Sequence, residues 1–205
     1  TSVGSKTTKA RWGGNSNYNA SPWSNSVTLT MNKAAGSVTT APVNNNYTYN
    51  GTARAVATAG SGTGTMYYRL GSSGSFSTTM PTMTDAGSST LYYYAAATTN
   101  YEQSDTGSIT VSVQKASQSA PTATGATTTY NTTATAKASG GGGQGSLEWE
   151  SAQSQTSVGS HSTRARWGGN SNYNASPWSN EVTVKMNKAP GSVTTAPVNN
   201  NYTYN

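Results

Sequence analysis

Residues 156–189 read TSVGSHSTRARWGGNSNYNASPWSNEVTVKMNKA and contain the clearest secondary-structure pattern of the chain. Within it, Val182, Val184 and Met186 alternate with polar residues. Successive side chains of a β-strand point to opposite sides, so this period of two predicts a strand with one apolar face. Elsewhere in the chain, no apolar pattern of helix length has the period of an α-helix. The sequence therefore predicts an all-β protein.

The same stretch occurs twice in the chain. Residues 1–50 match residues 156–205 almost throughout, with Thr1 aligned to Thr156. The copies lie too far apart to be units of a solenoid, which are about 20–50 residues long. Their separation suits a repeat of two small domains. The substitutions between the copies include Lys6 for His161, Lys9 for Arg164, Ser26 for Glu181 and Leu29 for Val184.

A weaker repeat lies inside the longer one. Residues 48–70 align with 129–151, and residues 91–116 align with 163–189. Each unit ends in a strand with alternating valines followed by Lys-Ala, so the joints between domains are short. Short joints favour a stiff rod of domains over a flexible tether. The predicted domains are the C-terminal half of a B-type domain at 1–33, an A-type domain at 34–115, a B-type domain at 116–188 and the start of the next A-type domain at 189–205.

The composition fits small β domains with polar surfaces. Charged residues make up 9 % of the chain, and the net charge is +6. The 13 tyrosines and 5 tryptophans can carry small cores, because each aromatic side chain buries a large area. The chain has no cysteine, so disulfides are not its source of stability. No apolar run approaches the roughly 18 residues of a membrane-spanning helix.

Alternation also predicts which side chains of neighbouring strands face the core. In residues 147–150 both glutamates point away from the tryptophan, and in residues 163–167 both arginines do the same. If these strands are neighbours, an acidic ladder faces a basic ladder, and such cross-strand pairs stabilise a sheet. The predicted ladder comprises Glu148, Glu150, Arg164 and Arg166. The predicted structural core comprises Trp149, Trp167, Tyr68, Tyr93, Val111 and Val184.

These features resemble bacterial immunoglobulin-like repeats. An aromatic residue, Trp149 or Tyr68, occupies the third strand as a buried tryptophan does in that fold. Asp85-Ala86-Gly87 is similar to the Asp-x-Gly that precedes its sixth strand. The Tyr-Asn-Gly opening, the Gly-Thr-x-Tyr-Tyr-Arg strand and the Ser-Asn-Tyr-Asn loop resemble Big/MBG-type tandem repeats of bacterial surface adhesins and phage fibres. The resemblance implies tandem immunoglobulin-like β-sandwich domains in an extended array, located outside the cell, on a cell surface or on a virion surface.

The residues that carry enzyme chemistry are few and scattered. Glu148 and Glu150 share one side of a strand, whereas the carboxylates of a glycosidase oppose each other across a cleft. His161 is the only histidine, and Lys6 replaces it in the other copy, which indicates an exposed polar position. No catalytic triad, cysteine nucleophile, calcium loop or histidine cluster occurs. The sequence predicts no enzyme, no cofactor and no metal site.

Four aromatic residues lie in Asn-rich connections, where two roles are open. They can form a stacking platform for a glycan, or they can fill the end of a domain or a joint between domains. Nucleic acid is not an expected partner, because the basic residues are spread out and Trp167 faces away from the nearest arginines. The four candidates are Trp23, Trp178, Tyr18 and Tyr173.

Three functions are consistent with this sequence. The first is a structural spacer in a stalk or fibre, whose partners are neighbouring repeats of the same chain. The second is an adhesin module that binds glycan weakly at each repeat and gains affinity by multivalency. The third is a self-assembling filament. Counterparts of Glu148 and Glu150 for Lys9 and Arg11 come from earlier sequence in an intact array, and in the given stretch another copy of the chain can supply them by strand addition.

Overall fold

The computed structural model describes residues 3–193, 195, 197–198 and 203–204. Over this part of the chain it contains strands, turns and bends and no helix, so the prediction of an all-β chain is confirmed there. None of the described segments is a helix long and apolar enough to cross a membrane. Residues 194, 196, 199–202 and 205 of the predicted A-type segment at 189–205 lie outside the described residues; the described part of the segment forms no strand, and the segment stays a prediction.

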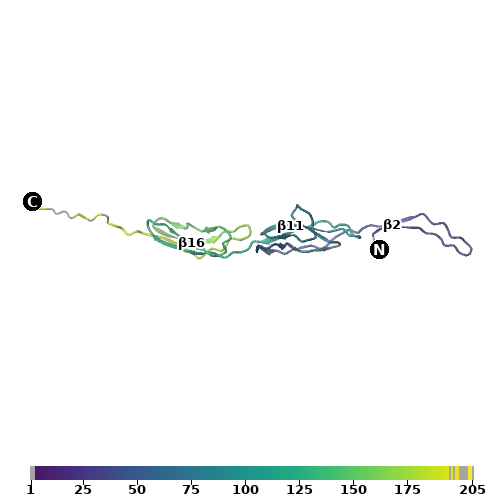
Figure 1. Ribbon diagram of the computed structural model, residues 1–205, viewed down its shortest axis with the longest axis horizontal. Helices are drawn as coiled ribbons and strands as arrows, with labels where there is room; N and C mark the ends of the chain where they lie inside the picture. Colours follow the sequence, from purple (N-terminus) through teal and green to yellow (C-terminus); the bar gives the residue numbers. More distant parts are fainter. Residues whose placement is uncertain (1–2, 194, 196, 199–202, 205) are drawn as a thin grey trace. The chain divides into compact units, whose positions relative to one another are not determined.

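The chain divides into two compact units, Thr1–Lys115 and Ala116–Asn205 (Figure 1). The division follows Lys115, the lysine of the second Lys-Ala joint. The limits predicted for the domains inside each unit stay predictions. The labels β2 and β11 in Figure 1 mark two parts of the first unit, and β16 marks the second unit.

A two-stranded hairpin opens the first unit. Strand β1 (Gly4–Thr8) pairs antiparallel with β2 (Val27–Met31), with Lys6 opposite Leu29. The long connection between the strands contains an Asx turn, in which the side chain of Asn15 accepts the N–H groups of Asn17 and Tyr18. Every residue of both strands is exposed.

The rest of the first unit is built on a four-stranded sheet. Its strand order is β5-β12-β11-β9, with β5 parallel to β12 and the other pairs antiparallel. The alternation expected from the sequence appears in β11, where Leu91, Tyr93 and Ala95 are buried and the residues between them are only half-buried. The bounds of the four strands are β5 (Tyr47–Thr48), β9 (Met66–Leu70), β11 (Gly87–Ala95) and β12 (Gly107–Gln114).

Short strand pairs complete this unit and share its core. Ala57 of β7 and Val56, which lies between β6 and β7, belong to one buried cluster with Tyr68, Leu91 and Val111 of the four-stranded sheet. The core therefore draws side chains from both sets of strands. The short pairs are β3 (Val38–Thr40) with β8 (Ser61–Gly62), β4 (Val43–Asn44) with β7 (Ala57–Thr58), and β6 (Arg54–Ala55) with β10 (Thr82–Met83).

The second unit repeats this pairing pattern. Strand β14 runs parallel to β21, and β19 pairs antiparallel with the other edge of β21. Strand β17 pairs antiparallel with β20. The short pairs are β13 with β16 and β15 with β18. The bounds are β13 (Thr122–Thr124), β14 (Ala126–Thr129), β15 (Ala134–Thr135), β16 (Lys137–Ser139), β17 (Leu147–Trp149), β18 (Ser154–Gln155), β19 (Gly159–Thr163), β20 (Ala165–Trp167) and β21 (Val182–Asn187).

The core of the second unit is smaller than the sequence suggests. Ala134, Ala136 and Val184 form its buried cluster, and the half-buried Trp149 packs against them. Trp167, predicted as a core residue, is only half-buried. Its indole N–H donates to the carbonyl oxygen of Gly140 at 2.8 Å, and this polar group needs such a partner when it leaves water.

Candidate functional site

The outer face of strands β17 and β20 carries a cluster of charged and aromatic side chains, which we call the Trp178 cluster. Alternation turns these side chains away from the buried cluster. Glu148 lies opposite Arg166 in the strand register, and Glu150 N–H donates to the carbonyl oxygen of Arg164 at 2.9 Å. The Trp178 cluster consists of Glu148, Glu150, Arg164, Arg166 and Trp178.

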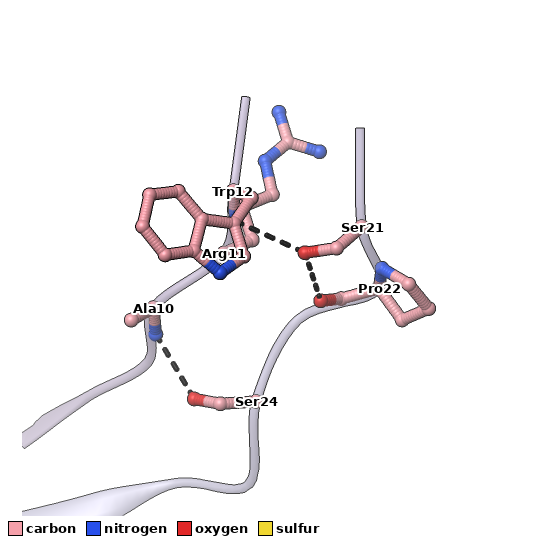
Figure 2. A pocket seen from close by; sticks show the side chains of 6 residues that line it. All are labelled: Ala10, Arg11, Trp12, Ser21, Pro22 and Ser24. Atoms are coloured by element: carbon pink, nitrogen blue, oxygen red, sulfur yellow. Dashed lines mark hydrogen bonds between the residues drawn. The ribbon is translucent and has the colours of Figure 1, made fainter. Parts of the chain in front are cut away.

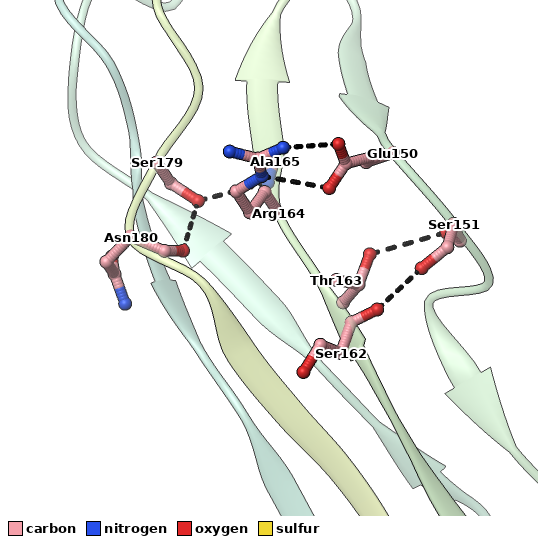
Figure 3. Close-up of polar contacts among 8 residues, drawn as sticks. All are labelled: Glu150, Ser151, Ser162, Thr163, Arg164, Ala165, Ser179 and Asn180. Carbon is pink, nitrogen blue, oxygen red and sulfur yellow. Dashed lines mark hydrogen bonds and ion pairs between the residues drawn. The ribbon is translucent and has the colours of Figure 1, made fainter.

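The outer ion pair joins Arg164 to Glu150 through two hydrogen bonds (Figure 3). The guanidinium Nε donates to one carboxylate oxygen at 2.9 Å, and Nη2 donates to the other. The hydrogen bond from Arg164 holds the pKa of the Glu150 carboxyl below its ordinary value, and the same bond raises the pKa of Arg164. The side chains are 39 % and 40 % exposed, so solvent screens the pair and limits its contribution to stability.

Arg166 links the ion-pair ladder to the tryptophan. Its Nε donates to Glu148 at 2.7 Å, while its guanidinium carbon lies 4.6 Å from the centre of the Trp178 ring. Arg164 lies 6.0 Å from the same ring. Arg166 thus contacts the half-buried indole by a cation–π interaction, and Arg164 lies at the limit of such a contact. A glycan that stacked on the side of the ring that Arg166 contacts would have to displace this guanidinium.

Serine hydroxyls hold the backbone beneath this cluster. Ser179 Oγ accepts the N–H of Ala165 at 3.0 Å and donates to the carbonyl oxygen of Asn180 at 2.8 Å (Figure 3). Ser176 Oγ makes the equivalent contacts with Trp167 N–H and the Pro177 carbonyl. Each hydroxyl therefore satisfies a backbone donor where the connection leaves the sheet.

A glycine-rich loop closes over Trp167. Residues 140–146 contribute the Gly140 carbonyl to the indole N–H, and the carbonyl of Ser146 accepts the N–H of Gly168 at 2.8 Å. The backbone of Gly145 lies so close to Gly168 that a Cβ at position 145 would be 2.0 Å from the Gly168 carbonyl oxygen. The loop therefore packs closely against residues 167 and 168, and position 145 has no room for a side chain.

Gln118 ties the same loop to the Asn-rich connection. This residue is buried, and its side-chain amide donates to the carbonyls of Gly168 and Asn174 while its oxygen accepts the N–H of Gln144. Sequence reasoning missed this residue and the serines described above. Polar residues in Ser- and Asn-rich stretches follow no period, so no signal in the sequence distinguishes them from their neighbours.

The first hairpin has the same hydrogen bonds between backbone N–H groups and serine hydroxyls as this site. Trp12 N–H donates to Ser21 Oγ at 3.0 Å, and Ala10 N–H donates to Ser24 Oγ at 3.0 Å (Figure 2). These bonds match those of Ser176 and Ser179 in the second copy. The repeated sequence therefore determines the local conformation of this connection.

The side chains of the first copy have different surroundings. Arg11 lies 4.7 Å from the ring centre of Trp23, as Arg166 lies beside Trp178. Among the described residues, however, no carboxylate forms an ion pair with Lys9 or Arg11. A hollow of about 460 Å³ lies beside the Trp12 indole (Figure 2), lined by Ala10, Arg11, Trp12, Ser21, Pro22 and Ser24.

The four aromatic candidates do not form one site. Trp23 and Tyr18 are exposed in the first hairpin, whereas Trp178 and Tyr173 are half-buried in the second unit. Tyr173 lies where the chain enters its domain, in a parallel bridge with Ala116. Tyr101 forms the equivalent bridge with Ala34 in the first unit. This tyrosine position therefore helps to fix the start of each domain.

His161 is not the exposed residue that its exchange for Lys6 suggested. It is half-buried, and its ring nitrogens lie 2.9 Å from Gln155 Oε1 and 2.6 Å from the Ala152 carbonyl oxygen. Both nitrogens therefore serve local structure. Across the described part of the chain, no three residues of the metal-binding types lie close enough together to hold a metal ion.

The four-stranded sheet of the first unit carries an aromatic version of the ladder. Arg69 lies 5.1 Å from the ring centre of Tyr92 and 4.6 Å from that of Phe76. Tyr67 and Tyr94 stack with ring centres 5.4 Å apart. Outward-facing side chains thus bind each other across neighbouring strands in both units, by ion pairs in one and by ring contacts in the other.

The chemistry of these surfaces is that of contact between strands. The charged groups are paired with each other or with rings, and the hydroxyls are engaged by the backbone. Comparison with models of protein families, with curated proteins and with solved structures finds no match for this chain.

Proposed function

We propose that the chain is a structural repeat of an extracellular, cell-surface or virion-surface stalk or fibre, in which it acts as a spacer. The observation that carries this proposal is that charged and aromatic side chains contact each other across neighbouring strands in both units. In the Trp178 cluster, each arginine is engaged by a glutamate and lies against the indole. Such contacts stabilise a small domain and leave few of these side chains available to bind a ligand.

We also propose that the domains are immunoglobulin-like β-sandwiches. The support is the pairing pattern, in which a short early strand runs parallel to the last strand, and a later strand (β11 in the first unit, β19 in the second) pairs antiparallel with that last strand. Buried side chains from the short strand pairs and from the four-stranded sheet also share one core. Both features recur in folds of two packed antiparallel sheets.

Small-angle X-ray scattering of the intact chain tests the spacer role. A single compact body of this length has a radius of gyration of about 17 Å. A spacer holds successive domains apart, so we expect a value well above that figure and one that does not change between low and high salt. A value near that of a compact body would contradict the proposal.

A glycan-binding adhesin module is the second candidate. It is favoured by the exposed indole of Trp12, which lines the hollow of the first hairpin, and by the exposed indole of Trp23. A glycan array with the intact chain, compared with the Trp23→Ala and Trp178→Ala variants, separates the two roles. Binding that either substitution abolishes in a folded protein supports the adhesin, and absence of binding supports the spacer.

A further inference from the structure

The first hairpin exposes an apolar face that the second copy of the same sequence buries. Leu29 is 61 % exposed and Met31 is 46 % exposed, whereas their counterparts Val184 and Met186 are 0 % and 1 % exposed. Trp12 is 83 % exposed, while its counterpart Trp167 is half-buried. A contiguous exposed apolar surface marks a place of interaction. We call this surface the hairpin face; it consists of Trp12, Val27, Leu29, Met31 and the edge of β2 that does not pair with β1.

The second unit shows what covers such a face. Residues 116–155, here called the front segment, place β14 parallel along β21, with Ala126 opposite Val184 and Thr128 opposite Met186. The same segment places β17 antiparallel along β20, with Leu147 opposite Trp167. The counterpart edges of the first hairpin, at residues 29–32 and 10–12, pair with no strand in the described part of the chain.

We propose that the hairpin face is a docking surface for a polypeptide segment with the sequence pattern of the front segment. The occupant lays one strand parallel on β2 and a second strand antiparallel beside residues 10–12. Its alternating residues cover Leu29 and Met31, and its glycine-rich loop fills the hollow beside Trp12. This is addition of strands to exposed edges, in which backbone hydrogen bonds give affinity and side chains give specificity.

Charge supports this occupant. Lys9 and Arg11 take the places of Arg164 and Arg166, whose partners Glu148 and Glu150 belong to the front segment. A docked segment with the same Glu-x-Glu spacing puts one carboxylate beside each cation. Opposite charges across neighbouring strands stabilise the pairing, and like charges oppose it.

The hairpin is also preorganised for docking. The bonds of Ser21 and Ser24 to the backbone are those of Ser176 and Ser179 in the copy that carries a front segment. The Asx turn at Asn15 likewise matches the turn at Asn170. Because these contacts exist before docking, the hairpin loses little conformational freedom on binding.

Within the described residues, the front segment at 116–155 already lies on the second hairpin. Exchange of this segment between identical chains covers one hairpin only by uncovering another, so it buries no additional apolar surface. The occupant is therefore a further front-type segment, distinct from the one that pairs with residues 156–188.

A titration tests this inference independently of the spacer role. A synthetic peptide of residues 116–155 is added to the intact chain, and binding is measured by calorimetry and by tryptophan emission. We expect one peptide per chain and a blue shift as Trp12 leaves water. Absence of binding, or binding that releases residues 182–187 to hydrogen exchange, would overturn the proposal.

Variants locate the bound peptide. Leu29→Asp puts a charge on the hairpin face and lowers the affinity at least about tenfold. Thr30→Lys is the matched control, because Lys185 occupies that position in the second copy and is exposed there. Gly145→Ala in the peptide leaves the chain untouched and also weakens binding, since its Cβ would meet the carbonyl of Gly13 as it would meet that of Gly168 in the second unit.

A covalent version removes any dependence on peptide solubility. Residues 116–155 are fused directly before Thr1, which reproduces the natural junction between Gln155 and Thr156. We expect the amides of residues 27–32 to become protected from hydrogen exchange. Unchanged exchange in the fusion protein would overturn the proposal whatever the peptide does. A chain that polymerises alone in light scattering would also overturn it, because a second copy would then be the occupant.

Discussion

The two hairpins, residues 1–33 and 156–188, share a sequence and a set of internal hydrogen bonds but differ in burial. Val184 and Met186 are buried under the front segment, while Leu29 and Met31 face solvent. The repeated sequence therefore determines the local conformation of the connection, and the packing partner determines the burial. Paired substitutions at matching positions measure how much of the stability comes from that partner.

The largest contrast is expected at the methionines. Met186→Ala removes a side chain that is 1 % exposed and lowers the free energy of unfolding of the second unit by about 2–5 kcal/mol. Met31→Ala changes stability by less than about 0.5 kcal/mol, because the side chain already meets water. Urea unfolding followed by tryptophan emission checks both, since residues 34–115 contain no tryptophan. Equal losses would show that both hairpins are packed alike.

A smaller contrast is expected at the glycines. In Gly168→Ala the new Cβ would lie 2.6 Å from Glu148 Oε1 and 3.2 Å from the Ser146 carbonyl oxygen. Displacing these atoms costs about 1–3 kcal/mol. Gly13→Ala meets nothing within 4 Å, so its unfolding curve should match that of the unsubstituted chain. A destabilised Gly13→Ala variant would mean that the first hairpin already carries a docked segment.

The arginines should show a weaker effect. Arg166→Ala removes a contact to Glu148 and a contact to the Trp178 ring, which together contribute on the order of 0.5–1 kcal/mol. Arg11→Ala removes only the contact to Trp23, so its effect should be smaller. Double-mutant cycles with Glu148→Gln and Trp178→Phe apportion the loss. Coupling energies indistinguishable from zero would contradict the role of Arg166 as a brace.

The smallest effect is the pH dependence of the Arg164–Glu150 pair. Because Arg164 lowers the pKa of Glu150, the stability from this pair is present above the ordinary glutamate pKa of about 4.3 and is lost as the pH falls through the lower folded value. The urea midpoints of the unsubstituted chain and of Glu150→Gln should therefore differ at pH 7 and converge in acid. A difference that persists after Glu150 is protonated would contradict this origin.

The sequence carried enough information to place residues on the two faces of a strand. A period of two leaves one choice of face for Val184 and for the residues beside it, so the inward and outward sets follow directly. Opposite charges at the same spacing on two segments also narrow the choice of neighbours, since Glu148 and Glu150 match Arg166 and Arg164.

The contacts that hold the connection and the glycine-rich loop in place could not be predicted from the period-two pattern. The hydroxyl bonds of Ser176 and Ser179, the buried amide of Gln118 and the glycine loop over Trp167 depend on backbone geometry that leaves no periodic signal. Nor could the alternation in residues 27–31 reveal that Leu29 is exposed, because the alternation is the same in the buried copy. Burial of that face depends on another segment of chain.

Hydrogen exchange of the backbone amides in the intact chain, resolved by NMR, measures whether a front-type segment, and not the hairpin sequence, stabilises the repeated strand. We expect protected amides in residues 182–187 to exchange at least about a thousandfold more slowly than their counterparts in residues 27–32, because the former open only when the domain unfolds. Equal protection of the two strands would contradict the account.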